Sequence, residues 1–182
     1  MYLSSRNNQF KFEFPRKFIP DEIIEKYKPF INKIPGNMLT EPIDMFNYGI
    51  QSLNITGISY TPTEQIDYPG ITRRHRSPQP TQELYDKNLQ ITMQSFSGFI
   101  NYWIALDLFT YYYRNKEAFL PEGVGLQILD GEGNVFVTIR MMEMLMTELD
   151  PIDFDFSSNS IEFNTFNINF AFNVYEIVIN TV

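Results

Sequence analysis

The residues that could carry chemistry are few, and their spacing gives no catalytic arrangement. Asp150, Asp153 and Asp155 lie near one another and could bind a divalent cation, although aspartates around a proline more often shape a turn. His75 is the only histidine and there is no cysteine, so neither a metal site of these residue types nor a catalytic triad has its partners. We therefore expect no enzyme, no metal and no cofactor.

The glycine-containing segment 130–134 lies between two short apolar runs, 126–129 and 135–138. Glycine can adopt positive φ, which tight hairpin turns require. Neither glycine of the segment precedes a helix in a phosphate-binding pattern. The segment is therefore predicted to be a hairpin turn and not a nucleotide site.

A basic run, Arg73-Arg74-His75-Arg76, lies within residues 61–82, which hold four prolines and show no periodicity. Long irregular loops in compact domains are usually functional or disordered. Arg73, Arg74 and Arg76 could form ionic contacts with another subunit, stay solvated, or grip nucleic acid. We prefer the contact with another subunit, because the rest of the chain is acidic.

The net charge of −8 is concentrated in the C-terminal half, since residues 88–182 contain 3 Lys and Arg against 12 Asp and Glu. Binding to nucleic acid phosphates requires a basic surface, which this half lacks. The acidity either serves solubility or lines a passage that nucleic acid crosses without binding.

The strongest periodic signal lies in the last predicted strand, where the apolar residues are Phe166, Ile168, Phe170, Phe172 and Val174. A period of two indicates a strand with one face on a core and one face toward water. The wet face carries Asn167, Asn169 and Asn173, although asparagine is depleted in strands. These three amides therefore need an explanation beyond strand propensity.

The remaining elements follow from similar patterns. We predict strands at 8–14 and 88–96, one long or two short strands within 43–58, a short helix near 21–33, and a major helix at about 99–114 capped by Ser95 or Ser97. A single domain, 1–182, mainly antiparallel β and sandwich- or barrel-like, accounts for this order. The aromatic content of 16% either fills a β core or divides between a core and a subunit interface.

The major helix is apolar on nearly every side, so it must be buried on more than one side. Either the core is large enough, or the side that carries Tyr111 and Tyr112 meets another subunit, which we favour. Methionines at 141, 142, 144 and 146 allow the same two interpretations. A core strand is the simpler one for the methionines, and Met142 and Met144 are the interface candidates.

No stretch predicts a membrane span or a signal peptide. The most apolar window, 99–113, is too short and contains Asn101 and Asp107. The absence of cysteine suits assembly in a reducing cytoplasm.

The C-terminal segment also follows a longer pattern: a leucine before a proline-containing turn, a strand, a polar turn with asparagine, and a long alternating strand that ends near an aromatic residue. The pattern falls on Leu149-Asp150-Pro151, 152–156, Ser157-Ser158-Asn159-Ser160 and 161–175. In this it resembles the tail tube proteins of contractile-tailed phages, which share a fold with the type VI secretion inner tube and with ring proteins of tails and baseplates. The resemblance covers about residues 8–14 and 43–180.

The resemblance implies a structural subunit of stacked, six-fold rings around a channel. Its partners would be further copies of itself, sheath, baseplate or neck proteins, and DNA passing through the lumen at ejection. Alternation along a channel wall places polar residues toward the lumen, so Asn167, Asn169 and Asn173 become candidate lumen residues. The phase change after Phe163 predicts a bulge at Thr165–Phe166. The protein would lie in the virion tail and assemble in the host cytoplasm.

The chain departs from the family pattern in two places. Residues 15–42 form a longer, inserted segment, and loop 61–82 is proline-rich where the family often has a hairpin that reaches the next ring. A neck, terminator or baseplate ring protein of the same fold is therefore an alternative. A monomeric ligand-binding β-sandwich is the alternative of another class, although it would expose aromatic residues where this chain places asparagine.

Overall fold

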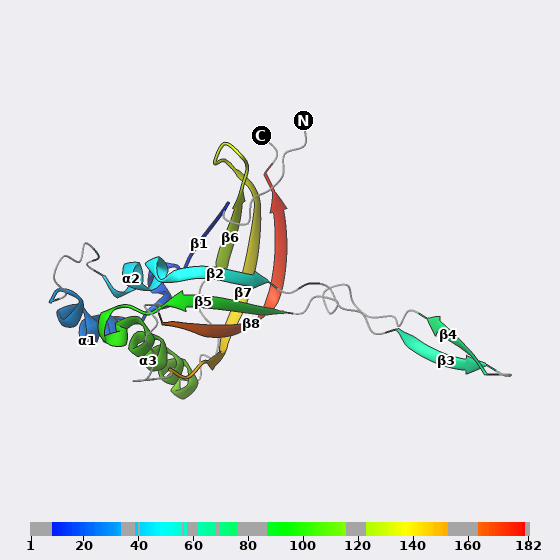
Figure 1. Ribbon diagram of the computed structural model, residues 1–182, viewed down its shortest axis with the longest axis horizontal. Helices are drawn as coiled ribbons and strands as arrows, with labels where there is room; N and C mark the ends of the chain where they lie inside the picture. The colour runs from blue at the N-terminus through cyan, green and yellow to red at the C-terminus, as the bar shows by residue number, and fades with distance from the viewer. Residues whose placement is uncertain are drawn as a thin grey trace, which may run out of the picture.

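A computed structural model describes residues 9–33, 39, 41–55, 57, 62–67, 70–75, 87–115, 123–152 and 164–180 (Figure 1). The strands are β1 (Phe10–Glu13), β2 (Ile50–Ile55), β3 (Thr63–Asp67), β4 (Ile71–His75), β5 (Asn88–Gln94), β6 (Val124–Leu129), β7 (Val135–Leu149) and β8 (Thr165–Ile179). The helices are α1 (Asp21–Ile31), α2 (Pro42–Tyr48) and α3 (Ile100–Arg114), with 3-10 turns η1 (Arg16–Phe18) and η3 (Ser97–Phe99). The predicted class, mainly antiparallel β with one major helix, is confirmed.

The main sheet consists of two four-stranded halves that share β7 and β8. Its strand order is β1-β6-β7-β8-β5-β2, and all pairs are antiparallel. β6 pairs with residues 135–141 of β7, and β5 pairs with residues 165–171 of β8. We call β2, β5, residues 165–172 of β8 and residues 142–149 of β7 the amide half. We call β1, β6, residues 135–141 of β7 and residues 173–179 of β8 the turn half.

The predicted alternation of β8 is confirmed in the amide half. Phe166, Ile168, Phe170 and Phe172 are each at most 2% exposed. They continue a core row from β5, where Leu89, Ile91 and Met93 are 0% exposed and pair with Phe170, Ile168 and Phe166 in register. Cross-strand apolar pairs of this kind stabilise a sheet and fix its register.

β7 and β8 bend together where the two halves meet. Met141 and Met144 are both buried although they are three positions apart, an odd spacing that would place them on opposite faces of a regular strand. Phe172 and Tyr175 both pack on the core with the same spacing. Glu143 has φ of 54°, a left-handed conformation that is unfavourable for residues other than glycine. The bend therefore changes which residues of β7 face the core. Before it, the buried residues are odd-numbered, as in Ile139 and Met141; after it they are even-numbered, as in Met144 and Met146.

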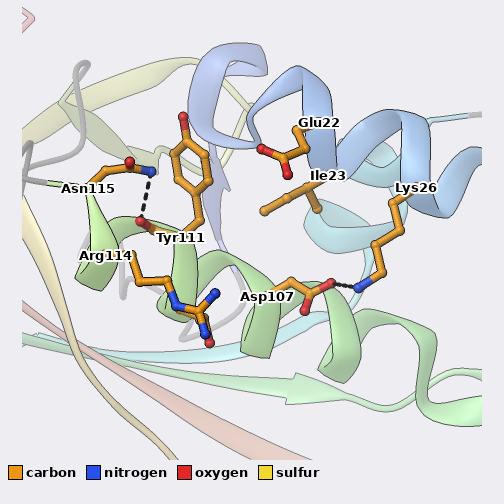
Figure 2. Close-up of a pocket in the computed structure, with 8 residues that line it drawn as sticks. Glu22, Ile23, Lys26, Asp107, Tyr111, Arg114 and Asn115 are labelled. Carbon is orange, nitrogen blue, oxygen red and sulfur yellow. Dashed lines mark hydrogen bonds and ion pairs between the residues drawn. The ribbon is translucent and has the colours of Figure 1, made fainter.

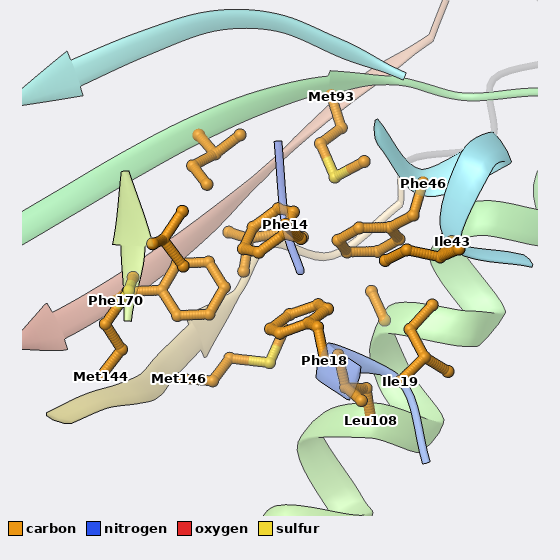
Figure 3. Packing of buried hydrophobic residues seen from close by; sticks show 14 of the residues in the cluster. Phe14, Phe18, Ile19, Ile43, Phe46, Met93, Leu108, Met144, Met146 and Phe170 are labelled. Carbon is orange, nitrogen blue, oxygen red and sulfur yellow. The ribbon is translucent and has the colours of Figure 1, made fainter. Parts of the chain in front are cut away.

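An aromatic cluster joins the sheet to the helices (Figure 3). The Phe14 ring lies 4.2 Å from that of Phe18, 5.3 Å from that of Phe46 and 5.7 Å from that of Phe170, measured between centroids. Aromatic pairs at such distances contribute about 0.5–1.5 kcal/mol beyond the burial of their area. The cluster connects the end of β1, η1, α2 and β8.

The strand predicted within 43–58 is half wrong, because α2 occupies its first part and β2 its second. Pro42 suits the first turn of a helix, where its missing N–H is not needed. Helical spacing then buries both Ile43 and Phe46. The Asn47 side chain exchanges hydrogen bonds with the Phe14 backbone, accepting at 2.8 Å and donating at 3.2 Å. Tertiary packing therefore decides for helix over the β propensity of this stretch.

Helix α1 confirms the predicted helix near 21–33, and Pro20 precedes it as expected. Pro29 lies inside the helix. The helix closes two residues later at Ile31, so the proline disrupts only its last turn.

Helix α3 matches the predicted range, but the predicted serine N-caps are wrong. The N-cap position is Phe99, with φ of 55° and no side-chain cap bond. Asn101 instead ties the helix start to β5: its Nδ2 donates to the Gln94 carbonyl at 2.6 Å, and its Oδ1 accepts from the Phe96 N–H at 3.1 Å. A buried amide satisfied in this way fixes the chain between strand and helix.

The irregular loop predicted at 61–82 is wrong for residues 63–75, where β3 and β4 form a hairpin paired from Thr63 with His75 to Asp67 with Ile71. All four prolines of the segment lie outside these two strands, so no ladder N–H is lost. Gly70 adopts φ of 100° before β4. The hairpin lies at one end of the molecule and the three α-helices lie at the other (Figure 1).

Candidate functional site

The face of the amide half that points away from the core carries two rows of polar side chains. One row crosses four strands in register as Asn54, Gln90, Asn169 and Glu148. The other is formed by Ser52, Thr92, Asn167 and Asp150. Asp150 follows β7, and its backbone N–H donates to the Asn167 carbonyl at 3.0 Å. We call these eight residues the polar face.

Each of the two asparagines that β8 contributes to the polar face is held by a carboxylate on β7 or just after it. Asn167 Nδ2 donates to Asp150 Oδ2 at 2.7 Å, and Asn167 Oδ1 accepts from the Thr92 hydroxyl at 2.8 Å. Asn169 Nδ2 donates to Glu148 Oε2 at 2.8 Å. These charge-assisted bonds across the strands account for asparagine at positions that strand propensity disfavours.

Asn173, the third candidate lumen residue, lies at the bend and not on the polar face. Its side chain is exposed, and Nδ2 donates to Glu143 Oε2 at 3.1 Å. The bond joins β8 to the one residue of β7 with positive φ. Asn173 is therefore placed to hold the bend, apart from Asn167 and Asn169.

The polar face is acidic and shallow. Its eight residues include the carboxylates of Glu148 and Asp150 and no Lys, Arg or His. A depression of about 370 Å³ lies over Asn54, Gln90 and Asn169. Amides and hydroxyls there can hydrogen-bond, but no nucleophile stands beside a base. Such a surface repels a polyanion.

Two strand segments have an open edge. Among the described residues, 142–149 of β7 and 173–179 of β8 pair with a strand on one side only, while β1 and β2 are the outermost strands. Ile177 and Ile179 on the open edge of β8 are 50% and 60% exposed, and they continue the row of Ile139 and Val137. An open edge with exposed apolar side chains is a site for strand addition.

The hairpin carries the basic candidates that the structure describes. Arg73 and Arg74 are exposed on β4, and Arg74 Nε lies 3.0 Å from Glu64 Oε1 of β3. Arg76 lies outside the described residues. Ile66 and Ile71 are 75% and 57% exposed.

The aromatic and methionine candidates divide between core and surface. Tyr112 is buried and its hydroxyl donates to the Phe18 carbonyl at 3.1 Å. Met144 is also buried, so neither residue keeps surface for a neighbour. Tyr111 and Met142 are half-buried and retain some.

A groove of about 450 Å³ lies between α1 and α3, over a polar stripe of α3 formed by Asp107, Thr110 and Arg114 (Figure 2). Asp107 forms an ion pair with Lys26 and accepts a hydrogen bond from the Tyr27 hydroxyl at 2.7 Å. Burial, and then the Asp107 carboxylate, raise the pKa of Tyr27 above its ordinary value. Only the Asp107 end of the stripe is therefore bonded to α1, and the groove stays open beside Thr110 and Arg114.

Other predicted features fall outside the described residues or carry no site. The bulge predicted at Thr165–Phe166 is wrong, because Thr165 and Phe166 pair with Gln94 and Met93 without a register shift. The possible cation site needs Asp153 and Asp155, which lie outside the described residues. Across the described part of the chain, no group of three or more His, Cys, Asp or Glu could hold a metal. None of the helices described there is long and apolar enough to cross a membrane.

Sequence reasoning missed the carboxylates that hold the amides. Glu148 and Asp150 are separated in sequence from Asn169 and Asn167 by the residues that join β7 to β8, so their pairing depends on register. The sequence did contain one indication of the polar face. Gln90 and Thr92 alternate with apolar residues on one predicted strand, and Asn167 and Asn169 do so on another.

Comparison with solved structures gives similar folds at low identity. The chain is similar to a chain of the anti-feeding prophage cap (AFP tube terminating cap), with a TM-score of 0.49 and 15% identity over 72% of this chain and 80% of that one. For the sheath-tube complex of an extracellular contractile injection system (PVC) in the extended state, the TM-score is 0.47 with 17% identity over 72% and 81%. For Hcp1 from Flavobacterium johnsoniae the TM-score is 0.34 with 14% identity over 70% and 84%.

These structures come from the class of assemblies that the sequence resembles. Their TM-scores lie below 0.5 and their identities below 20%, so they do not decide what this chain does. No family model and no curated protein sequence matches the chain.

Proposed function

We propose that the chain is a structural subunit that forms closed rings of a phage tail tube, and that its polar face lines the channel for DNA. The observation that carries the proposal is the open edge of β8 at 173–179, with Ile177 and Ile179 exposed beside it. Apolar residues at an unpaired strand edge invite another chain.

The strand count of the turn half supports a head-to-tail join. Its four antiparallel strands begin with β1 and end with β8, so these two edges run in opposite directions. A second copy related by rotation would bring its β1 alongside β8, and the sheet would continue antiparallel. Such heterologous contacts generate rings when the rotation closes.

The join would also cover the apolar row that one chain leaves incomplete. Burying about half of an isoleucine side chain contributes about 1 kcal/mol, so Ile177 and Ile179 together contribute about 2 kcal/mol per contact. Backbone hydrogen bonds along the edge add register and direction. Six copies per ring is the number that the resemblance implies.

The polar face is the surface suited to a channel. Its amides, hydroxyls and two carboxylates, without any Lys, Arg or His, would give a hydrated wall that repels anions. A polyanion could slide past such a wall without binding. Further copies in stacked rings and sheath, baseplate or neck proteins would be the other partners. The protein would then lie in the tail of a virion assembled in the host cytoplasm.

The test is size-exclusion chromatography with negative-stain microscopy of the protein and of Ile177→Lys/Ile179→Lys. The protein should form rings, and the lysine pair should remain a folded monomer because both positions are exposed and a buried charge at a new edge contact is unfavourable. Phe136→Lys is the matched control: Phe136 is 55% exposed but lies on β7 between β6 and β8. Rings from the lysine pair, or no rings from the unmodified chain under any salt condition, would refute the proposal.

The channel assignment has its own test in the charge of the polar face. Asn167→Lys/Asn169→Lys alone would place each lysine beside Asp150 or Glu148, so the variant should also carry Asp150→Asn and Glu148→Gln. Rings of this variant should retain DNA in a salt-dependent way and slow its passage, whereas unmodified rings should not. Tight DNA binding by unmodified rings would contradict the assignment.

A further inference from the structure

The groove between α1 and α3 is lined by two opposed charges, Glu22 and Arg114 (Figure 2). Lys26 and Asp107 neutralise each other at one end of the groove. Glu22 on α1 and Arg114 on α3 line it without an ion pair or hydrogen bond among the described residues. The groove thus has a negative wall and a positive wall.

The apolar part of the lining lies between these walls. Ile23 and Tyr111 line the same groove, and Tyr111 is half-buried. A ligand that matches the groove would carry one base and one acid a few ångströms apart, with an apolar side chain between or beside them.

One face of the β3–β4 hairpin has this composition. Glu64 and Arg74 lie opposite each other and form an ion pair, with their side chains 52% and 72% exposed. Ile66 is two residues from Glu64 on the same strand, so it shares that face, and it is 75% exposed. An isolated two-stranded hairpin is marginally stable, so exposed apolar residues on it indicate a missing partner.

The hairpin and the groove lie at opposite ends of the molecule (Figure 1). In the described structure a chain therefore does not place its own hairpin in its own groove. Complementary surfaces at opposite ends of one molecule produce head-to-tail contacts between copies.

We propose that the groove of one copy receives the β3–β4 hairpin of a second copy. Arg74 lies beside Glu22 in this contact, and Glu64 lies beside Arg114. Ile66 covers the apolar part of the groove. The inference rests on the proposed assembly of identical copies, and it adds a contact separate from the strand edges. It also gives the inserted segment 15–42 a role, because α1 supplies one wall of the groove.

The absence of native cysteine allows a direct test by cross-linking. Ile66→Cys protein mixed with Thr110→Cys protein under oxidation should give a disulfide-linked dimer on a non-reducing gel, since Thr110 lines the groove. Lys28→Cys on an exposed position of α1 outside the groove is the control and should give none. Equal cross-linking of Lys28→Cys would overturn the inference.

A charge exchange supplies the second test. The hairpin variant Glu64→Arg/Arg74→Glu keeps its internal ion pair but reverses its polarity, and the groove variant Glu22→Arg/Arg114→Glu reverses the walls. The exchanges are introduced into both cysteine proteins. Either exchange alone should lower cross-linking about tenfold, because two interface ion pairs become like-charge pairs. Both exchanges together should restore cross-linking, because the two ion pairs form again with reversed polarity.

The outcomes separate this inference from the ring proposal. Rings with no response of cross-linking to either exchange would overturn the groove contact and leave the ring intact. Cross-linking that follows the exchanges while no rings form would uphold the groove contact and overturn the ring. Each exchange alone could also lower cross-linking without the two together restoring it. That result would mean that the groove and the hairpin do not pair with each other, which also overturns the inference.

Discussion

The two halves of the main sheet differ in how completely one chain buries them. In the amide half, Phe166, Ile168, Phe170 and Phe172 are buried and the polar face is bonded within the chain. In the turn half, burial fades along the row toward β8, from Ile139 at 8% exposed to Ile177 at 50%. The difference teaches that one chain buries the core of the amide half but leaves the row of the turn half incomplete, which is where the proposed contact with a second chain would lie.

The largest effect is expected from Phe170→Ala in the amide half. Phe170 is 0% exposed and packs on the Phe14 and Phe18 rings, so its truncation should lower the free energy of unfolding by about 3–5 kcal/mol. Ile179→Ala in the turn half should lower it by less than about 1 kcal/mol in the isolated subunit. Urea unfolding of both monomers measures the two values, and similar losses would break the comparison.

The bonded amides of the polar face come next. Asn167→Ala leaves the Asp150 carboxylate and the Thr92 hydroxyl without their partner, so we expect a loss of about 1–2 kcal/mol in unfolding free energy. Asn173→Ala, at an exposed position with one bond, should lose about 0.5 kcal/mol or less. Thermal and urea unfolding should rank the two variants in this order. The reverse order would mean that the bend, and not the polar face, stabilises β8.

The joint between the halves can be tested at Glu143. Glu143→Val should destabilise the fold by about 1–2 kcal/mol, because a β-branched residue is disfavoured at φ of 54°. Glu143→Gly should be nearly neutral, since relief of the strained conformation offsets the greater entropy of the unfolded chain. Thr138→Val, at a regularly paired position of β7, is the control for valine itself. Equal stability of the valine and glycine variants would argue against a bend fixed at this residue.

The smallest effect concerns the turn between β6 and β7. The backbone N–H of Asn134, followed by that of Glu132, holds the pKa of Asp130 below its ordinary value. A lowered pKa in the folded state means that Asp130 favours folding above its unfolded pKa of about 3.9 and loses that contribution as the pH falls through the lower folded value. NMR titration of the Asp130 carboxyl measures the shift, and a pKa at or above 3.9 would contradict it.

The parts that could be predicted from the sequence depend on local pattern. The alternation of β8, the β6–β7 turn and the range of α3 follow from spacing alone, because burial of one face imposes the period. Helix α2 was missed because Ile43 and Phe46 suit strands as well as helices, and packing on Phe14 decides between them. The hairpin was missed because its prolines suggested a loop, although all of them lie outside the strands.

The site needed information that local pattern does not contain. The wet face of β8 was identified correctly, yet its bonds to Asp150 and Glu148 depend on the register of β7 against β8. The groove between α1 and α3 required the tertiary packing of the inserted segment. The open edges of β7 and β8 became visible only once the strand order was known.

Backbone amide hydrogen exchange tests the central claim most directly, by following residues 173–179 in the isolated subunit and in the assembled particle. Ile177→Lys/Ile179→Lys supplies the monomer. In it the amides of 173–179 that are not bonded to β7 should exchange rapidly, while those of 165–171 between β5 and β7 are protected. In the assembly, 173–179 should become as protected as 165–171. Protection of 173–179 already in the monomer, or rapid exchange that persists in the assembly, would contradict completion of the turn half by a second chain.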